Sequence, residues 1–159
     1  MPAAGGELVS GAKTGSARAP MEIPAFSIFS AISELFVTAG VLYAVISNLR
    51  GGVFRWKLLG LVLVFELTVN IVYMTQRASA ADSAAELSTA LKLFYAGHGI
   101  LSLIMFLTLC GVYISAVSDL GSDRETWFRR HRSGSWILIF FWMVSVSTGE
   151  AIFVLRYLV

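Results

Sequence analysis

Four long apolar stretches, separated by short polar segments, dominate the sequence. Each is about 20 residues long or longer, and about 20 helical residues at 1.5 Å per residue cross a hydrocarbon core of ~30 Å. The predicted spans run from about Ala25 to Ser47, from Trp56 or Leu58 to Thr75, from Leu91 to Val117 and from Ser135 to Tyr157. We therefore predict an all-α integral membrane protein, in which four transmembrane helices form an antiparallel bundle.

The polar segments predict the domain boundaries and the turns. Residues 1–24 are rich in Gly, Ala and Ser and contain no apolar run, which is typical of a disordered N-terminal tail. Residues 25–159 then form a single four-helix transmembrane domain. The Gly pair within residues 48–55 ends the first helix, residues 76–86 predict a polar loop with a partial helix, and residues 119–134 predict a charged loop.

Composition supports a membrane protein and predicts its orientation. The chain is 57% hydrophobic and 14% charged, with a mean hydropathy of +0.75. Its net charge is only +2, and the basic residues cluster between apolar runs, which favours membrane topology and argues against nucleic acid binding. The loops after spans one and three hold seven of the 12 Lys and Arg residues. We therefore expect these loops in the cytoplasm of a bacterial inner membrane, with both termini outside.

Each predicted span carries one ionisable residue in its interior, namely Glu34, Glu66, His98 and Glu150. Because neighbouring spans run antiparallel, their depths can be compared, and all four fall roughly 10–14 Å below the outer face. A carboxylate in the bilayer core costs about 2.5–3.5 kcal/mol on insertion scales, so these side chains should face protein or a wet cavity. The sequence thus predicts an intramembrane polar cluster.

Neighbouring polar residues extend the cluster along each helix. Ser27 and Ser30 precede Glu34 at helical spacing, and Ser102 follows His98. We predict four further supporting residues, and in the last span we align Met143, Ser147 and Glu150 on one face. The predicted supporting residues are Asn70, Tyr73, Tyr95 and Ser147.

Several chemistries fit this cluster. The polar groups could serve only as interhelical hydrogen bonds, each worth about 0.6–2 kcal/mol. As a metal site, Glu34, Glu66, His98 and Glu150 would suit iron or manganese. The same groups could pass protons or hold a quinone headgroup. Haem is the least favourable cofactor, because His131 lies in the loop at the opposite face, although a His98–Met74 pair stays open.

The charged loop at residues 119–134 contains further candidate residues. Aromatic and basic side chains in this loop are typical of headgroup contacts or of a partner-docking surface. The predicted contact residues are Arg129, Arg130, His131 and Arg132. The sequence contains no Walker loop, Ser-His-Asp arrangement, HExxH or paired CxxC motif, so it predicts no catalytic residues.

The C-terminal part resembles a known membrane family. His131-Arg132, Gly134, Trp136, the run from Trp142 to Gly149, and Arg156-Tyr157 are similar to the final segment of the four-helix family called domain of unknown function 420, the YozB/CtaM-like proteins. Arg50-Gly51-Gly52 and Gly97-His98-Gly99 are similar too. The family pattern has further histidines in the first hairpin, where this chain has Glu34 and Trp56.

This resemblance implies a function in haem-copper oxidase biogenesis. We therefore expect a multi-pass accessory or assembly protein that contacts respiratory oxidase subunits and the lipid bilayer. Two alternatives stay open. One is a redox, proton- or quinone-handling subunit of a membrane electron-transfer complex, and the other is a structural membrane subunit.

Overall fold

The structure is a computed structural model of the chain, and it describes residues 25–79, 88–122 and 124–157. The predicted tail at residues 1–24 and most of the predicted loop at 76–86 lie outside these residues. The described residues form five helices: α1 (Ala25–Leu49), α2 (Trp56–Ser79), α3 (Thr89–Ser118), the single-turn α4 (Trp127–Arg130) and α5 (Arg132–Tyr157).

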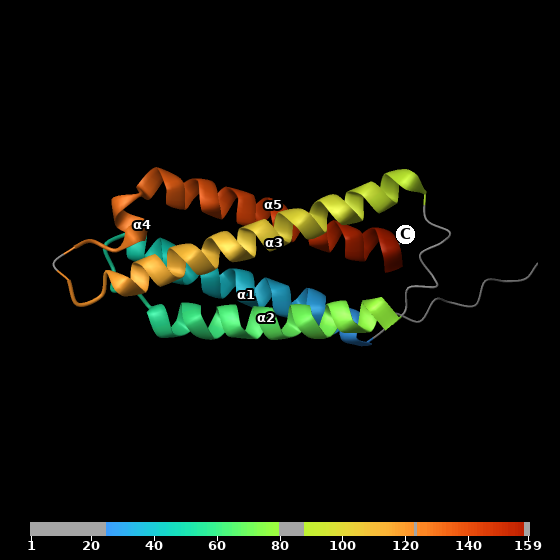
Figure 1. Cartoon of the computed structure of the whole chain (residues 1–159), viewed down its shortest axis with the longest axis horizontal. Helices are drawn as coiled ribbons and strands as arrows, with labels where there is room; N and C mark the ends of the chain where they lie inside the picture. The colour runs from blue at the N-terminus through green and yellow to red at the C-terminus, as the bar shows by residue number, and fades with distance from the viewer. Residues whose placement is uncertain (1–24, 80–87, 123, 158–159) are drawn as a thin grey trace, which may run out of the picture.

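The four long helices form an antiparallel bundle (Figure 1). Both α1 and α3 pack against α2 and against α5, so the helices close into a ring around a shared interior. The start of α1 and the end of α5 lie at one end of the bundle, and the α1–α2 turn and α4 lie at the other (Figure 1). The predicted all-α four-helix architecture is therefore confirmed.

The outer surface of the bundle is apolar. Four helices of 21 to 30 residues are long and apolar enough to cross a membrane, and at most 33% of each apolar window is buried inside the protein. Large side chains such as Phe36, Leu61 and Phe140 are exposed on this surface. Apolar surface of this extent is stable against lipid and not against water. The chain is a membrane-spanning protein.

The buried apolar core lies in the half of the bundle next to α4. Phe128 of α4 is completely buried, and its ring lies 5.4 Å from that of Phe54. Further from α4, the buried Trp142 donates its indole N–H to Thr38 Oγ1 at 3.2 Å. This bond joins α5 to α1 just below the predicted polar layer. The core residues include Val41, Val45, Leu59, Leu63, Leu109, Phe128, Leu138 and Trp142.

The α1–α2 turn is fixed by side chains from the α3–α4 region. Arg129 donates from Nε to the Asn48 carbonyl at 2.8 Å and from Nη2 to the Gly52 carbonyl at 2.7 Å. Thr126 donates to Asn48 Oδ1 at 2.6 Å. These bonds tie the turn to the α3–α4 region, and they add to the bonds that the same two carbonyls accept from Gly51 N–H and from Asn48 Nδ2.

This arrangement changes the sequence-based interpretation of the charged loop. Arg129, predicted to contact headgroups or a partner, binds the protein's own backbone. Arg130 pairs with Asp119 at 3.4 Å, and His131 stacks on Trp127 with ring centroids 4.8 Å apart. Arg132 is exposed at the start of α5. The loop also contains the short helix α4, which the sequence pattern did not predict.

Candidate functional site

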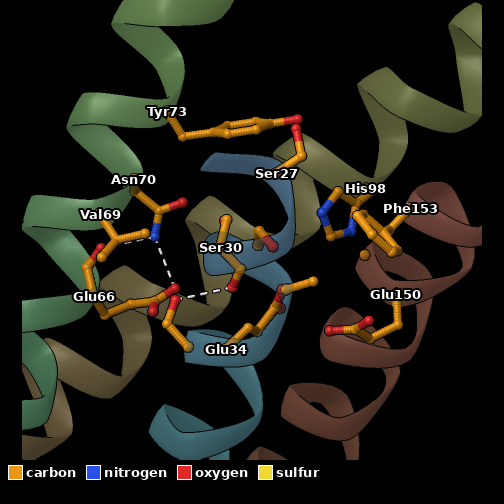
Figure 2. A pocket seen from close by; sticks show the side chains of 14 residues that line it. Ser27, Ser30, Glu34, Glu66, Val69, Asn70, Tyr73, His98, Glu150 and Phe153 are labelled. Atoms are coloured by element: carbon orange, nitrogen blue, oxygen red, sulfur yellow. Dashed lines mark hydrogen bonds between the residues drawn. The ribbon is translucent and has the colours of Figure 1, made fainter. Parts of the chain in front are cut away.

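The four ionisable side chains predicted from the sequence line one cavity. Glu34 comes from α1, Glu66 from α2, His98 from α3 and Glu150 from α5 (Figure 2). The cavity has a volume of about 120 Å³, which is room for several water molecules. It lies in the half of the bundle away from α4. Its lining residues are Ser27, Ser30, Ala31, Ser33, Glu34, Glu66, Val69, Asn70, Tyr73, His98, Ser102, Gly149, Glu150 and Phe153.

Gly149 of α5 allows Glu34 and His98 to approach each other. A Cβ atom at this position would lie 3.0 Å from His98 Cε1 and 3.4 Å from both carboxyl oxygens of Glu34. The imidazole from α3 and the carboxyl from α1 therefore meet above the same point on the α5 backbone. Because glycine has no side chain, it leaves room for both groups to pack against α5.

The hydrogen bonds of His98 determine which ring nitrogen can exchange a proton in the cavity. Its Nδ1 lies 2.9 Å from Thr148 Oγ1, and Thr148 donates its hydroxyl proton to the Ser145 carbonyl at 2.8 Å. A hydroxyl has one proton to donate, so His98 Nδ1 must supply the proton of the first bond. The Nε2 atom is then the nitrogen that can gain or lose a proton.

A second pair of hydroxyls holds α3 against α5 below His98. Ser102 Oγ and Ser145 Oγ lie 2.8 Å apart, and Ser145 is buried. Small hydroxyl residues allow transmembrane helices to pack closely and to hydrogen-bond to each other. Ser102, Ser145 and Thr148 therefore fix the position of the imidazole relative to α5.

Glu66 is oriented by its own helix. Asn70 donates from Nδ2 to Glu66 Oε1 at 2.7 Å and to the Glu66 carbonyl at 3.0 Å. Because the two residues are one helical turn apart, the amide holds the carboxyl toward the cavity (Figure 2). Tyr73, one turn further on, stacks on Phe26 with centroids 6.5 Å apart.

Glu150 has an incompletely satisfied carboxyl group. It extends from α5 toward α1 (Figure 2), and its Oε1 atom is buried without a hydrogen-bond partner among the described residues. A buried polar atom without a partner is uncommon and costs about 1–3 kcal/mol. The cavity beside it is polar and large enough for water, which can supply the partner.

Not every predicted supporting residue reaches the cavity. Asn70 and Tyr73 line it, whereas Tyr95 does not, and Ser147 is exposed on the outer surface of α5. The interior face of α5 instead carries Ser145, Thr148 and Gly149. The predicted alignment of Met143, Ser147 and Glu150 was therefore out of phase, and Met143 is also exposed. The i, i+3 spacing of Ser145 and Thr148 was the signal that could have identified Thr148.

The cavity does not fit the metal and haem sites considered from the sequence. Among the described residues no three His, Cys, Asp or Glu side chains are close enough to hold a metal ion, although Glu34, Glu66, His98 and Glu150 share the cavity. His131 stacks on Trp127 at the α4 end, far from His98. Met74 is exposed and does not line the cavity. A second axial ligand for a haem on His98 is therefore not in place.

Comparisons of the chain with family models, with curated proteins and with solved structures find no match.

Proposed function

We propose that the cavity is an intramembrane proton-exchanging site. The observation that carries this proposal is the convergence of three carboxyl groups and one imidazole on a single small polar cavity. No lysine or arginine is present among the described residues that line it. Three carboxylates cannot all be ionised together in such a site without protons or a cation to balance their charge.

The hydrogen bonds favour protons as the balancing species. His98 Nδ1 is committed to Thr148, so Nε2 is available to accept a proton. A carboxylic acid in the cavity can transfer its proton to Nε2 directly or through water. The O–H bond breaks, the N–H bond forms, and a carboxylate and an imidazolium remain as a pair. The pair has no net charge, so the transfer does not require a counter-ion.

The lining of the cavity favours protons and water, because carboxyl, imidazole and hydroxyl groups surround it. A volume of about 120 Å³ holds several waters. Ser27, Ser30 and Ser102 add hydroxyl groups that can hydrogen-bond to such waters. Of the alternatives that the sequence leaves open, proton handling therefore has the most support.

Infrared difference spectroscopy on the protein in lipid nanodiscs tests this proposal. The carboxylic-acid C=O band should change with pH, and each of Glu34→Gln, Glu66→Gln and Glu150→Gln should alter the pH dependence of the remaining carboxyls. Glu125→Gln, which removes an exposed carboxyl outside the membrane, should leave that dependence unchanged. If each variant loses the C=O band of one carboxyl and leaves the pH dependence of the others unchanged, the carboxyls do not share protons and the proposal fails.

A second proposal concerns the physiological setting. The similarity of His131, Arg132, Gly134 and Trp136 to the domain of unknown function 420 family favours an accessory or assembly function at a respiratory haem-copper oxidase in a bacterial inner membrane. Cells that lack the protein should then have reduced oxidase activity. Wild-type protein should restore it fully and Glu34→Gln only in part, with Glu125→Gln as the control. Full oxidase activity without the protein would refute this setting and leave the proton site untouched.

A further inference from the structure

A groove with one cationic end runs along the outside of α1. It follows the last two turns of the helix and the turn after it, and its volume is about 540 Å³. Leu42, Ile46 and Arg50 are four residues apart, so they lie on one face of the helix. The groove is therefore apolar toward the membrane interior and ends in a guanidinium. Its lining residues are Leu42, Tyr43, Ile46, Ser47, Arg50 and Gly52.

A second arginine lies beside the groove. The Arg55 guanidinium lies over the Tyr43 ring at 5.1 Å from the centroid, and Tyr43 is one of the lining residues. This cation–π contact places the Arg55 guanidinium against a side chain that lines the groove. Gly51, at φ 93°, allows the chain to reverse between the two arginines, because that backbone conformation favours glycine.

Among the described residues, no acidic side chain forms an ion pair with the two arginines beside the groove. The sequence contains no Asp or Glu between Glu34 and Glu66. Within the described part of the chain, neither Arg50 nor Arg55 forms an ion pair, and the one pair found joins Arg130 to Asp119. The carbonyls of Asn48 and Gly52 are taken by Arg129, so Arg50 is not needed to satisfy them. An anion from outside the chain would complete the site.

We propose that this groove binds an anionic phospholipid. The lipid phosphate contacts Arg50 and Arg55 at the membrane interface, and one acyl chain lies along Leu42, Tyr43 and Ile46 toward the bilayer centre. Arginine is well suited to this site, because its planar guanidinium can donate two parallel hydrogen bonds to a phosphate. The site is independent of the proton-exchanging cavity, which lies nearer the other end of the bundle.

Lipid retention measured by mass spectrometry tests the proposal. The protein is reconstituted in equal parts of phosphatidylglycerol and phosphatidylcholine, extracted into detergent and purified, and the two retained lipids are quantified. Wild-type protein should retain an excess of phosphatidylglycerol. Arg50→Gln combined with Arg55→Gln should lower this excess by about fivefold per arginine, since a basic residue at an anionic interface contributes about 1 kcal/mol.

A matched control separates a specific site from general charge. Arg124→Gln combined with Lys57→Gln removes the same charge from exposed positions at the same end of the bundle, and it should preserve the excess. Glycerol 3-phosphate and inorganic phosphate, which lack acyl chains, should not displace the lipid. An equal loss in both double variants, an unchanged excess in Arg50→Gln/Arg55→Gln, or displacement by inorganic phosphate would each overturn the proposal.

Discussion

Replacing Gly149 by alanine places a methyl group where Glu34 and His98 meet. The new Cβ would lie 3.0 Å from His98 Cε1 and 3.4 Å from both carboxyl oxygens of Glu34. Carbon atoms in contact prefer separations of about 3.5–4.0 Å, so the imidazole must move by roughly half an ångström. The movement also strains the hydrogen bond between His98 Nδ1 and Thr148.

The expected loss of stability follows from two opposing effects. A methyl group that forces packed neighbours to move costs about 1–3 kcal/mol, whereas alanine in place of glycine stabilises a helix by about 1 kcal/mol. Gly111 of α3 provides a matched control, because a Cβ there would meet no atom within 4 Å. The helix-propensity gain is common to both variants. Gly149→Ala should therefore be less stable than Gly111→Ala by about 1–3 kcal/mol.

Unfolding in mixed micelles, driven by a denaturing detergent, measures this difference. Gly111→Ala should be as stable as the wild type or slightly more stable, and Gly149→Ala should be the weaker of the two. The loss should be accompanied by an altered infrared signal from the cavity carboxyls, because the new methyl group contacts the Glu34 carboxyl and displaces the imidazole beside it. If Gly149→Ala matches Gly111→Ala in both measurements, His98 and Glu34 do not meet over the α5 backbone as described.

Three further predictions concern the fold and its orientation. Arg129→Ala should lower the free energy of unfolding by about 2–4 kcal/mol, because it leaves two carbonyls without charged donors. Arg132→Ala, at an exposed position, should change it by about 0.5 kcal/mol or less. Equal effects would mean that Arg129 does not hold the α1–α2 turn. A double-mutant cycle of Trp142→Phe and Thr38→Val, followed by the same unfolding assay, should give a coupling of about 0.5–1.5 kcal/mol, and a value of zero would mean that their hydrogen bond does not form. Reporter fusions at the C-terminus and within residues 119–134 should report opposite sides of the membrane, with the C-terminus outside; a cytoplasmic C-terminus would reverse the predicted orientation.

Hydropathy was sufficient to predict the architecture because the signal is strong over each whole span. The predicted first span ends at Ser47, and α1 ends at Leu49. The largest errors are at the second span, where α2 continues past Thr75 to Ser79, and at the fourth span, where α5 begins at Arg132 instead of Ser135. Its first turn is polar and follows α4 almost directly, so hydropathy alone does not distinguish it from a loop.

The site was only partly predictable, because a membrane helix is apolar on all sides. One ionisable residue per helix at a common depth was enough to find Glu34, Glu66, His98 and Glu150. The interior face of α5, however, centres on Trp142 and Gly149, and Glu150 lies at its edge. Ser147 lies further round the helix, beyond that edge, and is exposed. The hydrophobic pattern does not predict which face of α5 points into the bundle, because that orientation depends on which helices pack beside α5.

Nitrogen-15 NMR of the imidazoles tests the central claim most directly. The chain has two histidines, so His131→Gln leaves His98 as the only signal. In nanodiscs, Nδ1 should stay protonated across the pH titration, and the proton that is gained and lost should be on Nε2. The pH midpoint of Nε2 should shift in Glu34→Gln and Glu150→Gln but not in Glu125→Gln. A titrating Nδ1, or an Nε2 midpoint that no cavity variant changes, would contradict a shared proton-exchanging site.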